Sequence, residues 1–256
     1  MKRAFAFTGR NIRELLRDPL GYIFCLGFPL IMLIIMTIVD RSIPPKANMT
    51  VFHIENLAPG VAVFGQMFIM LFTALNVSTD RSGTFLMRLY ATPMTASDLT
   101  AGYIIPMLII SMVQAAITFT VAFIISVIVG SGLNIGGIFI CMITLIPSAL
   151  MFIGFGLIFG VLFNEKSAPG LCSIIISLGS FFGGIWFDAQ GTGGVMLKIS
   201  KCTPFFYCTK SARAAMALDF GADSFMIPLA IVVLCAVVLM SLSCFAFSKK
   251  MRTDLG

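Results

Sequence analysis

The chain has 256 residues, of which 59% are hydrophobic and only 11% are charged. Soluble domains carry about 25% charged residues and need a polar surface at this length, so the composition excludes an ordinary soluble globular protein. The formal net charge of +6 would suit a nucleic-acid binder, but the basic residues lie beside apolar runs, where they indicate anchoring near lipid headgroups. We therefore predict an all-α integral membrane protein that has no nucleic-acid partner.

Residues 1–19 predict an amphipathic helix that lies on the membrane surface. Apolar residues such as Ile12 and Leu15 cluster on one helical face, and basic residues cover the other faces. An ordinary soluble helix is the alternative. The stretch from Arg10 to Asp18 is charged and the next apolar run is too long for a signal-peptide core, so we expect the first span to stay in the membrane.

Six apolar runs follow, and each is close to or above the length of about 20 residues that crosses a bilayer core as a helix. The predicted transmembrane helices are residues 20–39, 57–77, 102–129, 135–163, 168–187 and 226–247. Two connections are longer than the others. Residues 78–101 are polar with short helical signals, and Thr95 or Ser97 can cap a helical piece there. Residues 188–225 are rich in glycine and partly amphipathic.

The distribution of Lys and Arg predicts how the chain is oriented. Alternate connections place 11 of the 17 basic residues on the side that holds both termini and residues 78–101, and 6 on the other side. Because short cytoplasmic loops carry an excess of Lys and Arg, we expect both termini to be cytoplasmic. The chain is therefore predicted to be a multi-pass protein of the cell membrane.

Ionisable residues are absent from a long part of the chain. No Asp, Glu, Lys, Arg or His occurs between Asp98 and Glu165. Ion-coupled transporters keep such groups inside the membrane and membrane enzymes need them for catalysis, so both classes are disfavoured. His53 is the only histidine, which argues against a metal site. The phosphate-binding pattern GxxxxGKS/T is also absent, so any energy source must lie in a separate protein.

Polar residues within the predicted spans have two interpretations. They are typical of hydrogen bonds between packed helices, and the alternative is a weakly polar translocation path. The candidates for such a path are Gln66, Thr73, Asn76 and Gln114.

The seven cysteines contain no CxxC pair. Most of them lie in apolar runs, where small buried residues are expected. Cys202 and Cys208 lie in the connection that we place on the outer side of the membrane, where a disulfide between them is one alternative.

Residues 80–93 predict a short helix that is exposed to the cytosol. Ser82 or Thr84 can cap this helix, and Pro93 ends it. Its apolar positions are Phe85, Leu86 and Leu89. A short helix with an apolar side and flanking charges suits docking into a groove on a partner protein. The alternative is a loop that only covers the helix ends.

In this loop the sequence resembles the permease subunits of ABC transporters of the ABC-2 type. Those proteins show an acidic stretch, then Gly-Thr-Leu, a Leu and Thr-Pro. The matching positions here are Gly83-Thr84, Leu89 and Thr92-Pro93. The sequence departs from the pattern with Phe85 where Leu is usual, and with Asp80 alone where acidic residues are often denser. Three further features resemble the family in the same order: Arg17-Asp18-Pro19 before the first span, Pro29 within it, and Pro204 to Arg213 before the last span. The resemblance covers essentially the whole chain.

The resemblance implies a single transmembrane domain over residues 1–256 that works as one part of a larger complex. Two permease chains, identical or homologous, would pair in the lipid, and each would dock on an ATPase subunit that binds ATP and Mg. This chain would then need no cofactor and would not be an enzyme. Its cargo would be a hydrophobic or amphipathic drug, lipid or peptide. A passive channel or a secondary transporter is the alternative.

The resemblance also implies roles for particular segments. Residues 188–225 would form re-entrant helices at the outer end of the path. The coupling helix that receives the ATPase would consist of residues 80–93, with Asp80, Gly83, Thr84, Phe85, Leu86, Arg88, Leu89, Thr92 and Pro93 as its site residues. The interfacial helix would contribute Arg10, Arg13, Arg17, Asp18 and Pro19.

Overall fold

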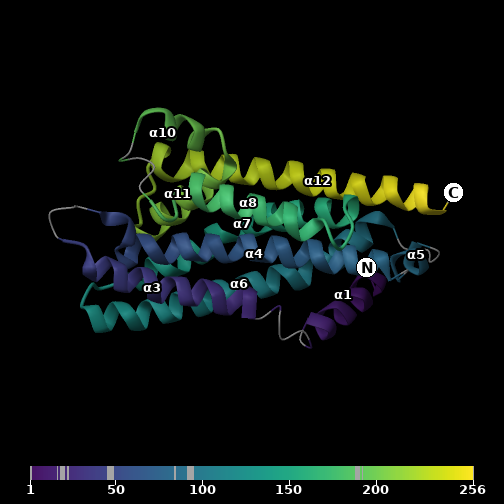
Figure 1. The fold of residues 1–256 in the computed structure, drawn as a ribbon, viewed down its shortest axis with the longest axis horizontal. Helices are drawn as coiled ribbons and strands as arrows, with labels where there is room; N and C mark the ends of the chain where they lie inside the picture. Colours follow the sequence, from purple (N-terminus) through teal and green to yellow (C-terminus); the bar gives the residue numbers. More distant parts are fainter. Residues whose placement is uncertain are drawn as a thin grey trace.

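The computed structural model describes residues 2–15, 17, 21, 23–44, 49–83, 85–90, 95–187, 191 and 193–255. Every regular element within these ranges is a helix, which confirms the all-α prediction. The long helices run along one axis, and both chain ends lie toward the same end of the bundle (Figure 1). We call this the terminal end and the opposite one the distal end.

Ten α-helices and three shorter helical turns make up the described part of the chain. The α-helices are α1 (Lys2–Leu15), α3 (Phe28–Ser42), α4 (Ile54–Ser82), α5 (Phe85–Tyr90), α6 (Ala96–Val129), α7 (Ile135–Leu162), α8 (Ala168–Phe182), α10 (Gly194–Lys201), α11 (Pro204–Met216) and α12 (Ile227–Leu255). The π-helical turns η1 (Ile23–Gly27) and η4 (Ala222–Met226) lead into α3 and α12, and the 3-10 turn η3 (Thr50–Phe52) precedes α4.

Five helical stretches are long and apolar enough to cross a membrane, so the chain is a multi-pass membrane protein. They are Ile23–Ser42, Ile54–Ser82, Ala96–Val129, Ile135–Leu162 and Ala222–Lys250. Each coincides with one of the six predicted spans. The remaining prediction, residues 168–187, falls on α8, which has only 15 residues. A helix of that length is about 22 Å long, which is less than the bilayer core of about 30 Å.

The end of α8 explains why the predicted span was too long. Gly183 follows the helix as its cap, and Gly184 has a φ of 66°, in the left-handed region that favours glycine. The apolar run continues to Phe187, but the backbone has already turned. Hydrophobicity therefore overestimated the length of this helix.

The connection at residues 78–101 is shorter than predicted because helices enter it from both sides. α4 continues to Ser82, and α6 begins at Ala96. Thr95 caps α6 in a reciprocal arrangement, in which the Asp98 amide donates to the Thr95 hydroxyl and the Thr95 amide donates to the Asp98 carboxylate. The helical piece that was predicted to begin at Thr95 or Ser97 is thus the first turn of the long helix α6.

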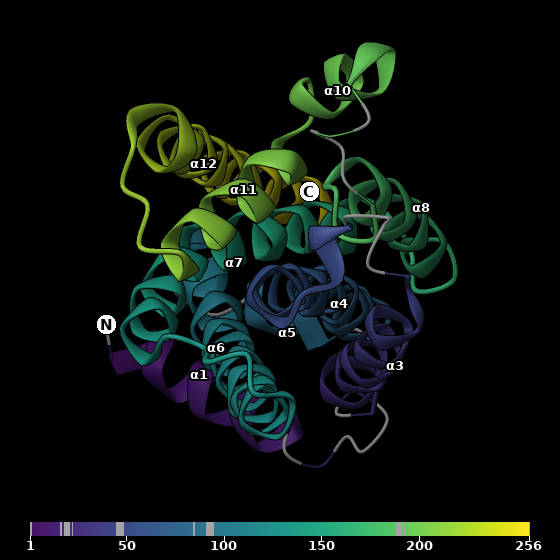
Figure 2. The same ribbon diagram turned by 90° about the vertical axis from the view of Figure 1, so that its left-hand side faces the viewer.

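α4 is the central helix of the bundle (Figure 2). Its apolar window is 78% buried inside the protein, compared with 17% for the window in Ile23–Ser42. It contacts α7, α6, α8, α11 and α3. The two short helices of the connection before α12, α10 and α11, lie at the distal end (Figure 1), and α11 packs on α4, α7 and α12.

Two glycines allow α7 to approach α4 closely. A Cβ atom added at Gly156 would lie 2.5 Å from the carbonyl oxygen of Met70, and one at Gly160 would lie 2.6 Å from the Cβ of Val77. Small residues spaced four apart let membrane helices pack backbone against backbone. This pair therefore defines the contact between the two helices at the centre of the bundle.

Replacing Gly156 with Leu is expected to force α4 and α7 apart and to lower the free energy of unfolding by about 1–3 kcal/mol. The matched control is Gly170→Leu, because Gly170 is exposed on α8 and has open space around its Cβ position. Thermal unfolding in detergent can be followed by the fluorescence of Trp186, the only tryptophan, whose ring lies 5.0 Å from that of Phe64. Equal stability of both variants would contradict the proposed packing.

Candidate functional site

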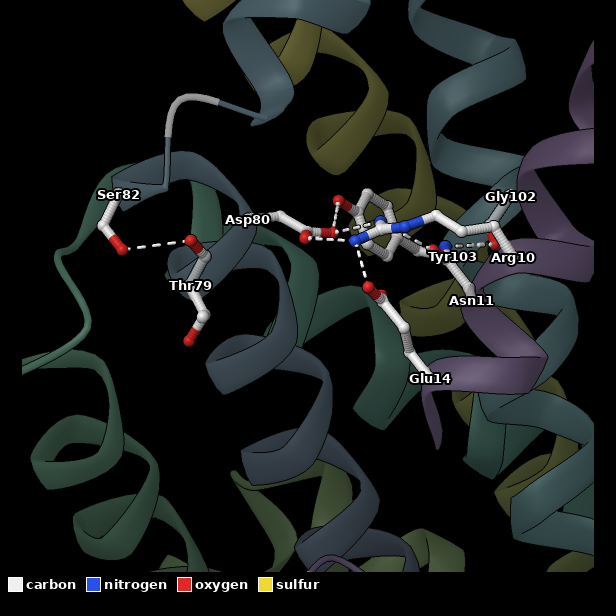
Figure 3. A network of polar contacts seen from close by, with 8 residues as sticks. All are labelled: Arg10, Asn11, Glu14, Thr79, Asp80, Ser82, Gly102 and Tyr103. Atoms are coloured by element: carbon white, nitrogen blue, oxygen red, sulfur yellow. Dashed lines mark hydrogen bonds and ion pairs between the residues drawn. The ribbon is translucent and has the colours of Figure 1, made fainter. Parts of the chain in front are cut away.

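Side chains from four helices meet at the terminal end, and Figure 3 shows the polar contacts that join three of these helices, α1, α4 and α6. We call this group the terminal junction, and it consists of Phe7, Arg10, Asn11 and Glu14 of α1, Asp80 of α4, Phe85 of α5, and Gly102 and Tyr103 of α6. It brings the predicted interfacial helix and the predicted coupling helix into contact with two transmembrane helices.

The Asp80 carboxylate accepts three hydrogen bonds at this junction. Arg10 binds it with two nitrogens, Nη1 to Oδ2 at 3.1 Å and Nη2 to Oδ1 at 3.0 Å. The Tyr103 hydroxyl donates to Oδ2 at 2.7 Å. Charge-assisted bidentate pairs of this kind are among the stronger hydrogen bonds in proteins. The Arg10 side chain is 29% exposed and that of Asp80 is 14% exposed, so water only partly screens the pair.

The same guanidinium links α1 to α5. It lies over the ring of Phe85, 3.7 Å from the ring centroid, which is the geometry of a cation–π contact. Glu14, one turn further along α1, accepts from the same guanidinium at 2.5 Å. Arg10 therefore contacts α4 and α5 at once and is held in place from its own helix.

The electrostatics of the junction favour a permanently charged Arg10. Burial alone would lower the pKa of Arg10, but the hydrogen bond and the charge of Asp80, with a contribution from Glu14, outweigh burial and raise the pKa above its ordinary value. The guanidinium thus keeps its charge throughout the physiological range.

α1 is held against α6 by a local fit that depends on glycine. A Cβ atom at Gly102 would lie 2.1 Å from Cδ1 of Phe7, and the Asn11 side-chain amide donates to the Gly102 carbonyl at 3.0 Å. The Phe7 ring also meets Tyr103 edge to face, with centroids 5.0 Å apart. One face of α1 therefore packs on protein. Arg13 and Arg17 are exposed, whereas Asp18 and Pro19 lie outside the described residues.

Within the predicted coupling segment, residues 80–93, the structure has the end of α4 at Ser82 and the separate short helix α5, whose apolar side faces the bundle. A coupling role for this segment stays a prediction. Leu86 is buried, and Phe85 and Leu89 pack partly against the same cluster as Phe7 and Tyr103. Gly83 is the exposed residue that ends α4. Thr84, Thr92, Pro93 and the side chain of Arg88 lie outside the described residues.

A second set of contacts ties the end of α4 to the turn between α7 and α8. The Arg81 guanidinium donates to the carbonyl oxygens of Val161 and Phe163, which belong to the last turn of α7 and its cap. The Ser82 hydroxyl lies 3.1 Å from the Glu165 carboxylate and donates to it. The sequence pattern gave no contact role to Arg81, Tyr103 or Asn11. Their positions at the terminal ends of α4, α6 and α1 were the only available signal.

The predicted path residues are distributed through the interior of the chain. Gln66 donates to the Leu145 carbonyl at 3.0 Å and so joins α4 to α7. Thr73 and Gln114 are also buried, and they bond within their own helices. Asn76 is half-buried and borders a small cavity beside Asp80. These contacts are those of helix packing, and a role in translocation stays a prediction.

The two cysteines of the suggested disulfide are both free thiols in the structure. Cys202 is exposed just after α10, whereas Cys208 is buried in the middle of α11. The structure therefore contains no bond between them.

Asp80→Asn or Arg10→Gln alone is expected to lower the free energy of unfolding by about 1–3 kcal/mol, because each leaves a partly buried charge without its main partner. The double variant should lose less than the sum, with a coupling energy of about 1–2 kcal/mol in a double-mutant cycle measured by thermal unfolding. Arg13→Gln, at an exposed position on the same helix, is the control and should change stability by less than about 0.5 kcal/mol. Strictly additive losses would show that Arg10 and Asp80 do not interact.

Comparison with known proteins identifies the family to which this chain belongs. The profile of the family described as ABC-2 type transporter matches residues 3–217, a range that begins within α1, ends just after α11 and includes the whole terminal junction. A search of curated proteins gave no match. The match covers most of the chain. The protein belongs to the ABC-2 type transporter family, as a membrane component of a transporter.

Proposed function

We propose that this chain is the permease subunit of an ATP-driven ABC exporter. The observation that carries the proposal is the terminal junction, in which one arginine holds a surface helix and a short connecting helix against the central span. A transporter without its own ATPase needs an element that receives movement from a partner. Here α5, which lies between α4 and α6 in the chain, is such an element, and its Phe85 contacts Arg10 and Phe7 of α1.

The terminal end is proposed to face the cytoplasm. Exposed or half-buried basic residues at that end include Arg10, Arg13, Arg17, Arg81, Lys166, Lys249 and Lys250. The short distal loop before η3 and the one between α6 and α7 contain almost no Lys or Arg. An excess of basic residues in short cytoplasmic segments supports this orientation.

In the proposed mechanism an ATPase subunit docks on α5 and the adjacent turn. Movement of α5 is passed through Phe85 to Arg10 and from there to Asp80 in the last turns of α4. Arg81 and Ser82 extend the same connection to the turn between α7 and α8. Because α4 packs on five other helices, a shift at its end is transmitted to most of the bundle.

The full assembly is proposed to contain two permease chains, identical or homologous, and two ATPase subunits, which bind ATP and Mg. Its cargo is a hydrophobic or amphipathic drug, lipid or peptide, in keeping with the apolar character of the helices. Gln66, Thr73, Asn76 and Gln114 remain the candidates for polar contacts along the path.

Coupling can be tested with Arg10→Gln in the complex with its ATPase, reconstituted in lipid. At a temperature below the unfolding transition, transport and cargo-stimulated ATP hydrolysis should fall about tenfold, equivalent to about 1.4 kcal/mol. Basal hydrolysis by the ATPase should persist, because its own site is untouched. Arg13→Gln is the control and should behave like the original protein. Full stimulation in a folded Arg10→Gln complex would refute this route of coupling.

Topology can be tested by cysteine labelling in a Cys202→Ser background, since Cys202 is the exposed cysteine among the seven. Met49→Cys, at an exposed distal position, should react with a membrane-impermeant thiol reagent added to intact cells. Thr95→Cys, exposed at the terminal end, should react only after the membrane is opened. The opposite pattern would place the termini outside and remove α5 from any cytoplasmic partner.

A further inference from the structure

A polar cavity of about 310 Å³ lies at the distal end, away from the junction. It is formed by η3, the start of α4, the end of α8, α11 and the turn before η4. Its lining residues are Thr50, Val51, Asn56, Gly183, Gly184, Phe206, Thr209, Lys210, Arg213, Ala214, Ala217, Asp219 and Ser224. A cavity lined by two cations, a carboxylate and several hydroxyls is unusual in a chain with so few charged residues.

Lys210 and Arg213 reach the cavity from one side of α11. They are three positions apart, so they lie one above the other on the same helical face. Among the residues that the structure describes, Lys210 forms no ion pair. Its ammonium group is therefore available to a ligand.

The Arg213 guanidinium is held in a fixed position on the cavity wall. Its Nε donates to the Asn56 carbonyl at 3.0 Å, and Asn56 is anchored in turn because its side-chain amide donates to the Thr50 carbonyl at 2.9 Å. The guanidinium also extends over Gly60, where an added Cβ atom would lie 3.4 Å from its Nη2.

The one carboxylate in the cavity wall is engaged by its own turn. Asp219 accepts from the Gly221 amide at 3.1 Å. The hydrogen bond from Ser224, and to a smaller extent the one from Gly221, lower the pKa of Asp219. The Asp219 carboxylate therefore stays charged, and groups of its own turn already bind it. Lys210 and Arg213 together therefore leave the cavity with a net positive charge.

We infer that this cavity binds a single anionic group, a phosphate or a carboxylate, between Lys210 and Arg213. Its volume is at the lower end of the range for ligand sites and suits one charged group with a short attachment. The source is either a free anion or cargo group, or the headgroup of an anionic lipid in the adjacent leaflet. That this leaflet is the outer one rests on the proposed topology. The net positive charge of the cavity does not depend on that topology.

The cavity can be probed by thiol modification of Thr50→Cys in the Cys202→Ser background, using the purified full chain. Thr50 is exposed and contributes its backbone carbonyl to Asn56, which the substitution retains. An anionic sulfonatoethyl methanethiosulfonate should react faster than the cationic trimethylammonium reagent, by about threefold for each nearby unit charge. Lys210→Gln should lower this rate ratio about threefold, and Lys198→Gln, exposed on α10 outside the cavity, should leave it unchanged.

Competition then identifies the source of the anion. Inorganic phosphate, compared with chloride at equal ionic strength, should slow the anionic reagent in a saturable way if the site takes a free anion. Nanodiscs of phosphatidylcholine with phosphatidylglycerol, compared with phosphatidylcholine alone, should slow it without phosphate if the site takes a headgroup. Protection in either arm supports the site, provided that Lys210→Gln abolishes the protection. Arg213→Lys keeps the charge and should retain protection.

The inference is overturned if neither phosphate nor phosphatidylglycerol protects Thr50→Cys. It is also overturned if protection survives Lys210→Gln, or if the rate ratio of the two reagents does not respond to that substitution. These rates are measured without the ATPase and without transport. The anion site can therefore be refuted while the proposed transport function stands, and transport can be refuted while the anion site stands.

Discussion

Within a bilayer, lipid tails are as apolar as leucine, so helices gain little from hydrophobic burial and are held by close packing and hydrogen bonds. In this protein that constraint is met by the contact of α4 with α7. Gly156 and Gly160 bring the two backbones together, and Gln66 adds a hydrogen bond to Leu145 across the contact. The positions of the other helices follow, because α4 is the helix against which most of them pack.

The two ends of α4 carry different chemistry. At the terminal end Asp80 is bound by Arg10 and Tyr103, and Phe85 lies under the same guanidinium. At the distal end Asn56 receives Arg213 beside a polar cavity. A movement that tilts or shifts α4 would therefore alter both places together. In the proposed transporter, α4 would connect the terminal junction, which receives the ATPase, with the distal cavity, where an anionic group of cargo or lipid would bind.

The junction also changes how the interfacial helix is understood. A basic amphipathic helix was expected to rest on lipid, with Arg10 as one of several headgroup anchors. In the structure only part of α1 has that character, since Arg13 and Arg17 are exposed while Phe7, Arg10 and Asn11 bind protein. The helix is thus attached to the bundle by specific contacts. This attachment suits an element that moves with the spans and does not float beside them.

Several features could be read from the sequence because they depend on local or collective properties. The bilayer thickness sets the length of an apolar run, which located five spans. Thr95 or Ser97 could be proposed as a helix cap because a cap involves only neighbouring residues, and the structure has Thr95 in that role. The order of motifs around Gly83 and Leu89 indicated the family, whereas the orientation inferred from Lys and Arg stays a prediction.

Other features were decided only by the tertiary structure. Arg10 and Asp80 are 70 positions apart, and their pairing depends on how α1, α4 and α6 are arranged around one another. An apolar residue has the same pattern whether it faces lipid or another helix, so hydrophobicity could not show that α4 is central or that α8 ends at Gly183. Polar residues such as Gln66 are equally ambiguous in sequence, because a buried helix contact and a translocation path call for the same side chains. Local pattern specifies which segments enter the membrane, whereas the contacts between distant segments specify what each side chain touches.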